Sequence, residues 1–363
     1  MTNILQQKYD VIGLMSGTSL DGLDIAFCRF SVDNKQWKYE IVCAETIEYS
    51  DVWKQKLLSL ETADALTFQL VHAEYGQFIG RLVADFIIKN SIKPDFVASH
   101  GHTIFHQPDK KLTVQVGSGA AIAANCKLPV VCDFRTLDVA LGGQGAPLVP
   151  IGDQRLFGEY DFCLNLGGFA NISYEHFGKR IAFDVCPVNI VLNAFAARFG
   201  KKYDDKGEIA RSGLISNYLL NEFDNLSHYR ILPHTPKSLG KEWVVNNIDP
   251  LIEKYEMEDS DFMRTFTEHI AFQIARVVNV KPYSRMLVTG GGTHNEFLME
   301  RIKALCKVEI VVADTDTINF KEALIFAFLG VLRWRGEVNC LKSVTGARED
   351  SSGGSIYSPG LFR

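Results

Sequence analysis

The chain lacks three features that would each point to a class of protein. It has no Cys-x-x-Cys pair, no glycine-rich loop ending in Gly-Lys-Ser or Gly-Lys-Thr, and no apolar run long enough to cross a bilayer, the longest being residues 323–334. Its eight cysteines are scattered and several lie in apolar segments, which is typical of reduced thiols in a protein core. These absences argue against a disulfide scaffold, a P-loop enzyme and a membrane-spanning protein.

Positive charge is also in short supply. The formal net charge is -5 and the pI is about 6.0, with Lys and Arg spread along the chain, so we expect no nucleic-acid partner. Residues 1–8 are polar and carry no apolar signal core, which favours a cytoplasmic location. A length of 363 residues suits two domains, each with its own core.

The most distinctive feature that is present is the segment at residues 13–24, GLMSGTSLDGLD. Apolar residues precede it at 9–14 and resume at 23–30, so the pattern predicts a strand, a tight turn and a second strand. No helix pattern follows, which favours a strand-turn-strand phosphate clamp over a P-loop. The alternative is an ordinary hairpin whose glycines and serines only make a tight turn.

The residue types in this hairpin suit a nucleotide. Gly13 and Gly17 let backbone N–H groups approach an anion, and Asp21 or Asp24 is suited to orient a hydrated cation. The hydroxyl donors are Ser16, Thr18 and Ser19. A nucleoside triphosphate with Mg²⁺ satisfies all of these groups together, so we expect ATP and Mg²⁺ here.

The rest of the chain alternates strand and helix patterns. Predicted strands lie at 37–49, 96–99, 114–116, 130–134, 162–166, 169–174 and 286–289, and predicted helices at 64–90, 119–126, 214–223, 259–278, 295–306 and 319–335. Glycines at 142–145 mark a boundary, and Gly167-Gly168 and 290–292 follow later strands. This pattern predicts an α/β protein of two similar halves.

We expect one domain from residues 1–150 plus 319–363 and a second from 151–318. Two halves that each open with a glycine-bearing hairpin favour the two-domain actin-like fold of actin and hexokinases. In that fold the nucleotide and the sugar bind in the cleft between the domains.

With these residues in view, the chain resembles the anhydro-N-acetylmuramic acid kinases over nearly its whole length. The similar blocks, in chain order, are 13–24; Ser99-His100-Gly101 with Thr103, His106 and Pro108; Asp133-Phe134-Arg135 with Asp138 and 142–150; 165–172; Pro236-Lys237-Ser238; 290–295; and 345–347.

The resemblance implies a reaction and a set of site residues. ATP phosphorylates 1,6-anhydro-N-acetylmuramic acid while water opens its anhydro bridge, which gives N-acetylmuramic acid 6-phosphate in peptidoglycan recycling. Asp184 matches the catalytic aspartate of the family, and a carboxylate beside the attacking water is a natural general base. A homodimer is also implied.

The expected ligand contacts follow from the same blocks. Nucleotide contacts are expected at Gly17, Thr18, Ser19, Leu20, Asp21, Gly22, Leu23, Asp24, Gly167, Gly168, Asn171, Gly290, Gly291 and Gly292. Sugar contacts are expected at His100, Thr103, Arg135 and Gln144. Asp21 and Asp24 are the expected metal ligands. Glu322 is the second catalytic candidate. As an acid in the first turn of the helix expected at 319–335, it serves equally well as a partner of the helix dipole.

Some positions depart from the family pattern. Around Asp184 the family reads Asp-Thr-Gly-Pro-Gly-Asn, whereas Val185, Cys186 and Val188 stand here, and Asn193 replaces a later acid. The lost hydroxyl and glycines put phosphate geometry in doubt more than reaction type. His102, Phe105 and Gln107 stand where the family has Gln, Arg and Arg, which bears on recognition of the substrate carboxylate.

Other hypotheses remain at this point. A related kinase for another amino sugar and a catalytically weak sugar-sensing protein are the alternatives for function. The histidines at 100, 102 and 106 suggest a metal site, because alternate residues of a strand share a face, but no nearby Cys or acid completes the set.

Overall fold

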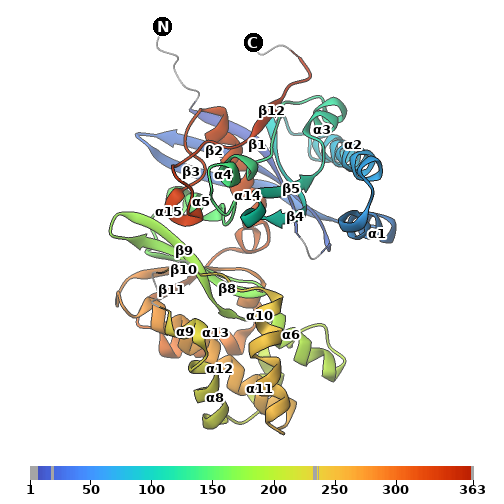
Figure 1. Ribbon diagram of the computed structural model, residues 1–363. Helices are drawn as coiled ribbons and strands as arrows, with labels where there is room; N and C mark the ends of the chain where they lie inside the picture. The colour runs from blue at the N-terminus through green and yellow to red at the C-terminus, as the bar shows by residue number, and fades with distance from the viewer. Residues whose placement is uncertain (1–6, 18–19, 232–234, 236, 361–363) are drawn as a thin grey trace. The chain divides into compact units, whose positions relative to one another are not determined.

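The computed structural model describes residues 7–17, 20–231, 235 and 237–360, and it divides the chain into two compact units. The first unit comprises residues 1–156 and 320–363, and the second comprises residues 157–319. The first break lies later than the boundary expected at 150, because helix α5 (Val149–Leu156) runs across that position without interruption. Figure 1 shows the helices and strands of each unit.

The first unit is built on a seven-stranded sheet with the order β12-β6-β4-β1-β2-β3, in which β5 pairs with β4. Strands β1, β2 and β3 form an antiparallel meander, whereas β4 and β6 run parallel to β1. The strands are β1 (Lys8–Ser16), β2 (Gly22–Asp33), β3 (Gln36–Glu48), β4 (Phe96–Gln107), β5 (Leu112–Val116), β6 (Val130–Cys132) and β12 (Ser355–Tyr357).

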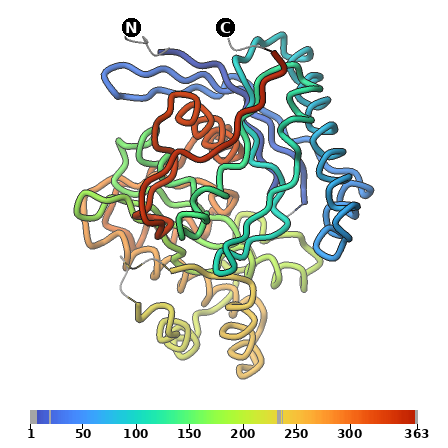
Figure 2. Tube along the Cα trace, turned by 45° about the horizontal axis from the view of Figure 1, so that its top comes forward, coloured from blue at the N-terminus to red at the C-terminus, as the bar shows by residue number. Residues whose placement is uncertain are grey.

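Helices cover both faces of this sheet. Ile12 and Leu14 of β1 pack in one hydrophobic core with Tyr75, Ile79 and Val83 of helix α2 (Ala65–Asn90). Gly13, between them, faces helix α14 (Thr315–Trp334) on the opposite side, as the alternation of a strand requires. Figure 2 shows this late, red segment lying against the blue strands from the start of the chain.

The second unit is built on a five-stranded sheet with the order β11-β10-β7-β8-β9. Its strands β7, β8 and β9 form an antiparallel meander, and β10 and β11 continue parallel to β7. The strands are β7 (Phe162–Leu166), β8 (Phe169–His176), β9 (Lys179–Pro187), β10 (Arg285–Thr289) and β11 (Glu309–Val312). The buried helix α12 (Asp259–Val278) packs against β9 and contributes much of the core.

The remaining helices are short or peripheral. In the first unit they are α1 (Asp51–Ser59), α3 (Gly119–Cys126), α4 (Thr136–Ala140) and α15 (Lys342–Thr345), and in the second unit α6 (Asn189–Ala196), α7 (Glu208–Ser212), α8 (Asn217–Asp224), α9 (Ser227–Arg230), α10 (Lys241–Asn247), α11 (Asp249–Lys254) and α13 (Glu296–Leu305).

The two sheets share one topology. Each contains a three-stranded antiparallel meander and, beside its first strand, two strands parallel to that strand; the first sheet adds β5 and β12, which are antiparallel to their neighbours. The expectation of two similar α/β halves and an actin-like architecture is therefore confirmed at the level of each unit.

Two element boundaries differ from those expected. Strand β4 continues to Gln107 instead of ending at Ser99. Its second half contains polar residues whose pattern does not predict a strand, and pairing with β5 holds that half extended. Helix α14 begins at Thr315, where the Asp314 carboxylate accepts hydrogen bonds from the Thr317 amide and hydroxyl.

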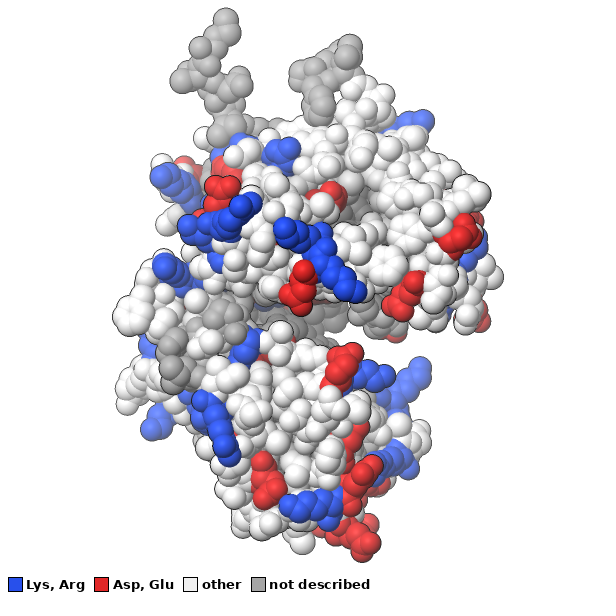
Figure 3. Space-filling view, in the orientation of Figure 1, with Lys and Arg blue, Asp and Glu red and all other residues white. Residues whose placement is uncertain are grey.

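On the face shown in Figure 3, Lys and Arg side chains are interspersed with Asp and Glu on each unit. Among the residues that the structure describes, none of the helices combines the length and apolar character that crossing a bilayer requires.

Candidate functional site

The hairpin loop between β1 and β2 begins where the register of these strands ends, at Ser16 and Leu23. The Gly17 carbonyl accepts a hydrogen bond from the Leu20 amide at 3.2 Å, and Leu20 adopts a left-handed φ of 59°. This hydrogen bond brings Gly17 and Leu20 close together. Thr18 and Ser19, two of the predicted nucleotide contacts, lie outside the described residues.

Two glycines of this hairpin have structural reasons to be glycine. A Cβ on Gly13 would lie 1.9 Å from the Ala323 carbonyl oxygen of α14, so the idea that Gly13 admits an anion is wrong. A Cβ on Gly22 would lie 2.6 Å from the Ile47 carbonyl oxygen of β3. Both residues permit close packing inside the first unit, and Gly17 is left as the candidate for a phosphate contact.

Asp24 is the better placed of the two predicted metal ligands. It lies on β2, half-buried, and its Oδ1 accepts a hydrogen bond of 2.6 Å from the Thr46 hydroxyl on β3. Burial raises the pKa of Asp24, the Thr46 hydrogen bond opposes this, and the charge of Asp21 adds to it. Asp21 itself is exposed.

Arg135, His100 and Glu322 come together in the first unit, from three separate parts of the sequence. Arg135 Nε donates a hydrogen bond to His100 Nε2 at 2.9 Å, and Arg135 Nη1 donates one to the Gly145 carbonyl at 2.7 Å. The His100 ring and the Arg135 guanidinium both lie against the Phe326 ring. Phe326 follows Glu322 by one turn of α14, so the two share a helix face.

The charges in this cluster interact. Partial removal from water raises the pKa of Glu322, and solvent moderates this effect because the residue is exposed. The positive charge of Arg135 lowers this pKa, and the negative charge of Asp24 raises it. Burial lowers the pKa of Arg135 to about 10, and the charge of Glu322 opposes this change. Glu322 lies well inside α14, so the alternative that it only complements the first turn of a helix is wrong.

The histidines do not form the metal site that their spacing suggested. A register shift in the pairing of β1 with β4 interrupts the strict alternation between Ser99 and His102. His100 uses both ring nitrogens, bonding the Gly101 carbonyl through Nδ1 and Arg135 through Nε2. No group of three His, Cys, Asp or Glu residues suited to a metal occurs within the described part of the chain.

His102 belongs to a different contact set, a chain of hydrogen bonds beside the hairpin. Its Nδ1 lies 2.9 Å from the Ser16 hydroxyl, which in turn bonds the Tyr49 hydroxyl at 2.7 Å. The Tyr49 hydroxyl bonds that of Tyr75. All four side chains are buried, and sequence reasoning missed this cluster because its members come from β1, α2, β4 and the end of β3.

The other predicted sugar contacts have mixed surroundings. The Thr103 hydroxyl accepts a hydrogen bond from Gln115 at 3.3 Å, and the Gln144 side chain is exposed. Phe105, at a position where the family has Arg, stacks on Phe68 with 5.9 Å between ring centroids. Its role is therefore in packing.

Asp138 organises the glycine-rich loop that carries Gln144 and Gly145. It is buried, and its carboxylate accepts hydrogen bonds from the Gly145 amide at 2.8 Å and the Thr345 hydroxyl at 2.7 Å. A Cβ on Gly143 would lie 2.2 Å from this carboxylate. The loop is thus fixed from within, and through the Gly145 carbonyl it fixes Arg135.

Asp184 lies on β9 of the second unit, directly before an irregularity in the pairing with β8. Asn171 pairs with Asp184 and Ala170 with Cys186, so Val185 is an extra residue. Such a bulge re-aims side chains and is common beside active sites. The pairing also brings Asn171, a predicted nucleotide contact, directly opposite Asp184.

A short segment clamps Asp184. The Asp184 amide donates to the Lys237 carbonyl at 3.0 Å, and Asp184 Oδ2 accepts from the Leu239 amide at 2.8 Å. His228 Nε2 donates to the Asp184 carbonyl at 3.0 Å. Burial raises the pKa of the Asp184 carboxyl, and the Leu239 amide partly opposes this. Within the described part of the chain, Asp184 Oδ1 has no hydrogen-bond partner.

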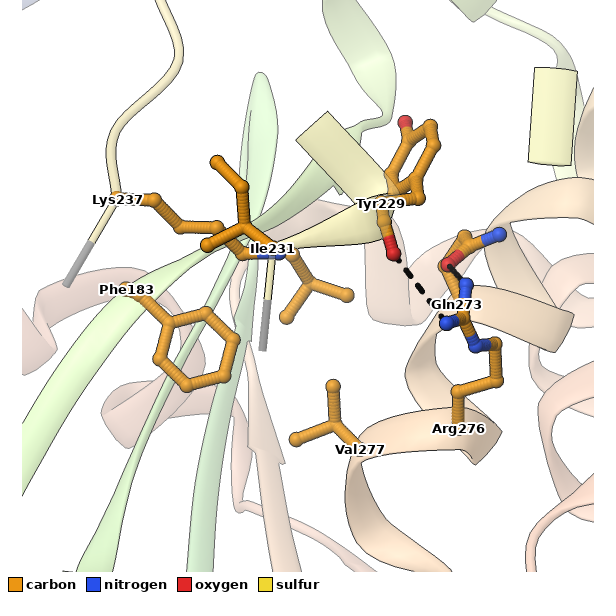
Figure 4. Close-up of a pocket in the computed structure, with 8 residues that line it drawn as sticks. Phe183, Tyr229, Ile231, Lys237, Gln273, Arg276 and Val277 are labelled. Carbon is orange, nitrogen blue, oxygen red and sulfur yellow. Dashed lines mark hydrogen bonds between the residues drawn. The ribbon is translucent and has the colours of Figure 1, made fainter. Parts of the chain in front are cut away.

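The clamp is anchored by side chains around a small pocket that Phe183 and Val185 line from β9 (Figure 4). Lys237 Nζ donates to the His228 carbonyl at 3.1 Å and lies over the Phe183 ring. Arg276 of α12 donates to the Tyr229 carbonyl and to Gln273, the dashed lines of Figure 4. These contacts tie the clamp to the core. Pro236, which precedes Lys237 in the family motif, lies outside the described residues.

The departures around Asp184 lie in this core. Val185, Cys186 and Val188 are each at most 2% exposed and pack in the main hydrophobic cluster of the second unit. These departures therefore alter the packing of the core around Asp184.

The glycine clusters of the second unit divide by role. The carbonyls of Gly167 and Gly168 accept hydrogen bonds from amides at the start of α6. A Cβ on Gly290 or Gly292 would lie 2.7 Å from atoms at the end of β7, so both residues permit close packing. Gly291 has nothing within 4 Å of an added Cβ and is the residue of this cluster best placed to leave room for a ligand.

Comparison with known proteins identifies the class that this fold and these residues define. The family model described as Anhydro-N-acetylmuramic acid kinase matches residues 9–359. The chain therefore belongs to the anhydro-N-acetylmuramic acid kinase family.

Individual relatives agree with the family match. The chain is similar to the Anhydro-N-acetylmuramic acid kinase of Francisella tularensis subsp. novicida, with 34% identity over 94% of this chain and 97% of the relative. It is also similar to that of Vibrio parahaemolyticus, with 34% identity over 96% and 98%. A ROK family glucokinase from Streptomyces griseus solved with glucose and AMPPNP is similar at 10% identity and a TM-score of 0.40, covering 88% of this chain and 98% of that one, values too low to bear on function.

Proposed function

We propose that this chain is an ATP-dependent kinase that converts 1,6-anhydro-N-acetylmuramic acid to N-acetylmuramic acid 6-phosphate in peptidoglycan recycling. The observation that carries the proposal is the state of Asp184. One of its carboxylate oxygens is anchored by the Leu239 amide, and the other has no partner among the described residues. That arrangement leaves an oriented lone pair for a water molecule.

The proposed reaction couples opening of the anhydro bridge to transfer of the phosphoryl group. Asp184 accepts a proton from a water molecule as the water oxygen forms a bond to the anomeric carbon of the sugar, and the bond from that carbon to the bridge oxygen breaks. The bridge oxygen takes the γ-phosphoryl group of ATP, and ADP leaves. The raised pKa of Asp184 suits a general base, because a carboxylate that holds a proton more readily removes one more effectively.

The first unit supplies the groups for the phosphate end of the reaction. Gly17 and its neighbours in the hairpin are the proposed phosphate contacts, with Gly167, Gly168, Asn171 and Gly291 proposed for the second unit. Asp21 and Asp24 stay the proposed Mg²⁺ ligands, because they are hard oxygen donors whose charges interact, and Mg²⁺ is commonly held by one or two carboxylates plus phosphates and water. Glu322, whose charge also interacts with Asp24, stays the second catalytic candidate. When bound, the ion would neutralise charge on the transferred phosphoryl group.

Arg135 is proposed as the partner of the substrate carboxylate. Its Nε and one terminal nitrogen are held by His100 and Gly145, which fixes the plane of the guanidinium. His100 then acts by positioning Arg135 and not by touching the sugar. Thr103 and Gln144 stay proposed sugar contacts, and the homodimer and the cytoplasmic location stay predictions.

The test is ADP release, followed in a coupled assay with a panel of sugars. We expect turnover with 1,6-anhydro-N-acetylmuramic acid and none with N-acetylglucosamine at the same concentration. Turnover with N-acetylglucosamine or another hexosamine, and none with the anhydro sugar, would instead identify a kinase for a different amino sugar.

A further inference from the structure

The main chain of Asp184 takes part in a closed ring of hydrogen bonds. Among the described strands β9 is the last of its sheet, so its outer edge is bound by other parts of the second unit. The Asp184 amide donates to the Lys237 carbonyl at 3.0 Å, and the Asp184 carbonyl accepts from His228 Nε2 at 3.0 Å. Lys237 Nζ in turn donates to the His228 carbonyl at 3.1 Å. Each of the three residues therefore donates once and accepts once.

The direction of each hydrogen bond in this ring is fixed by its acceptor. All three acceptors are carbonyl oxygens, which cannot donate, so the donors are an amide, an ammonium group and an imidazole N–H. Burial lowers the pKa of His228 to about 4, and the charge of Lys237 adds to this change, so the imidazole is neutral near pH 7. Its single proton is then on Nε2, the nitrogen that bonds the Asp184 carbonyl.

The ring lies where the pairing of the sheet is irregular. Val185 is the extra residue of the bulge, so the pairing with β8 does not by itself fix the direction of the Asp184 side chain. The segment that contains Lys237 also supplies the Leu239 amide, which donates to Asp184 Oδ2 at 2.8 Å. One segment therefore binds both the main chain and the carboxylate of Asp184.

Packing holds the two side-chain donors of the ring in place. His228 is only 5% exposed, and its imidazole lies edge-on to the Trp243 ring with 5.6 Å between centroids. Lys237 Nζ lies 5.5 Å from the centroid of the Phe183 ring, on the residue that precedes Asp184. The donors are thus oriented before any ligand binds.

We infer that His228 and Lys237 are positioning residues, which hold Asp184 and the Leu239 amide in the arrangement that leaves Asp184 Oδ1 for a water molecule. The inference rests on the proposed function, in which Asp184 accepts a proton from that water molecule. Both residues act through Asp184, so neither has to touch the nucleotide or the sugar.

Substitution of His228 tests the first donor. His228→Leu removes the N–H group and keeps an apolar side chain, whereas His228→Gln keeps an N–H donor. We expect kcat to fall about 10–100-fold in His228→Leu, because displacing a group by about 1 Å costs on the order of 10²-fold in rate. The KM for the sugar should stay unchanged, and His228→Gln should recover most of kcat. A folded His228→Leu protein with a normal kcat would overturn the inference.

A second substitution tests whether the ring acts as a unit. Lys237→Met removes the other side-chain donor and keeps an apolar stem over the Phe183 ring. Because one broken bond opens the ring, the double variant should lose little more kcat than either single variant. Losses that multiply would show that the two residues act separately and would overturn the ring. Lys237→Met also keeps His228 and its packing, so it provides the kcat test if His228→Leu does not fold.

His72→Leu in the first unit is the matched control. His72 Nδ1 accepts a hydrogen bond from the Gly117 amide at 3.2 Å, so this variant also loses one bond between a histidine and the main chain. It should lower Tm and leave kcat unchanged. An equal loss of kcat in His72→Leu would show that the effect of His228→Leu is only a general loss of stability.

The NMR signal of the Leu239 amide provides a readout that needs no turnover. Its ¹H and ¹⁵N shifts should follow the protonation of Asp184 in the unmodified protein and in His228→Gln, because this amide donates to the carboxylate. The response should be lost in His228→Leu and in Lys237→Met, and an unaltered response would overturn the inference. An unmodified protein that fails to turn over the anhydro sugar would reject the proposed substrate, while the Leu239 signal would still decide whether His228 positions Asp184.

Discussion

Each unit has a half-buried carboxylate, Asp24 or Asp184, near the turn of its meander, but the two lie on different strands. In the first unit Asp24 of β2 pairs with Thr46 of β3, and in the second Asn171 of β8 pairs with Asp184 of β9. Asp24 and Asn171 each belong to the second pair from the turn of their hairpin, opposite Met15 and Asn165. The acid is thus on the second strand in one unit and on the third strand in the other.

The two carboxylates differ in their hydrogen-bond partners and so in the oxygen atoms that remain for a ligand. Asp24 is held by the hydroxyl of its cross-strand partner, whereas Asp184 is held through one oxygen by a backbone amide from a different segment. Burial raises the pKa of both. A carboxylate beside the phosphate hairpin suits a cation, and one with an open oxygen on a bulged strand suits a water molecule. The same topology therefore supports two different roles.

Removing the base should have the largest effect. In Asp184→Asn the amide cannot take a proton from water, so kcat is expected to fall by about 10²–10⁴-fold, the usual contribution of a general base. Nucleotide affinity should stay close to that of the unmodified protein. Coupled ADP release and nucleotide titration measure the two quantities, and a variant that turns over near the normal rate would remove Asp184 from the mechanism.

The equivalent substitution in the first unit should act on the cation instead. Asp24→Asn is expected to weaken the apparent affinity for Mg²⁺ by about 10–100-fold, the scale seen when groups that support a metal are changed. Saturating Mg²⁺ should restore most of kcat. Titration of activity with Mg²⁺ at fixed ATP measures this. If excess Mg²⁺ restored Asp184→Asn and not Asp24→Asn, the proposed division of roles would be reversed.

The pH dependence should follow Asp184. The base must be ionised, and burial raises its pKa above the ordinary value of 3.8, so kcat/KM is expected to fall about tenfold per pH unit below that raised pKa. The same shift has a stability consequence. A carboxyl whose pKa is raised on folding stabilises the native state when protonated, and this contribution is lost as the pH rises through the folded pKa.

Asp184→Asn carries no such penalty at neutral pH, so its Tm at pH 7 is expected to exceed that of the unmodified protein. At a pH below the ordinary aspartate pKa the two melting temperatures should converge. Thermal melts at both pH values test this, and a variant that melts lower at pH 7 would show that the carboxylate stabilises the fold.

The smallest expected effects are those of alanine substitutions at the neighbouring residues Gly291 and Gly292. Gly292→Ala places a Cβ 2.7 Å from that of Leu166, so overpacking is expected to destabilise the protein by about 1–3 kcal/mol. Gly291→Ala meets nothing within 4 Å, so stability should hold while nucleotide affinity weakens by a few-fold. Denaturant unfolding and nucleotide titration separate the two, and equal stability losses would contradict this assignment.

The sequence predicted those parts of the fold that depend on local pattern. Helices α3 and α12 and strand β7 lie where their apolar periodicity placed them. The start of α14 was missed although Asp314 caps it, because the apolar run that drew attention begins later. The length of β4 was missed because only its pairing with β5 makes Ser99 to Gln107 extended.

The candidate site was predictable where one residue or motif was sufficient, and not where contacts join distant segments. The hairpin stands out in the sequence, whereas only the resemblance to the family singled out Asp184, whose catalytic role stays a proposal. The free oxygen of Asp184 depends on a clamp from residues 237–239, and the buried contact set of His102 joins Ser16 to Tyr49 and Tyr75. Gly13 illustrates the opposite error, since a glycine in a phosphate-like motif serves the packing of a helix from the other end of the chain.

The measurement that tests the central claim most directly is the fate of solvent oxygen. The reaction is run in H₂¹⁸O with 1,6-anhydro-N-acetylmuramic acid and ATP, with preformed N-acetylmuramic acid 6-phosphate incubated alongside to correct for exchange at the anomeric carbon. We predict one ¹⁸O at the anomeric carbon of the product and none in its phosphate. Label in inorganic phosphate, with the anhydro bridge intact, would show that water attacks the nucleotide and would contradict the role of Asp184.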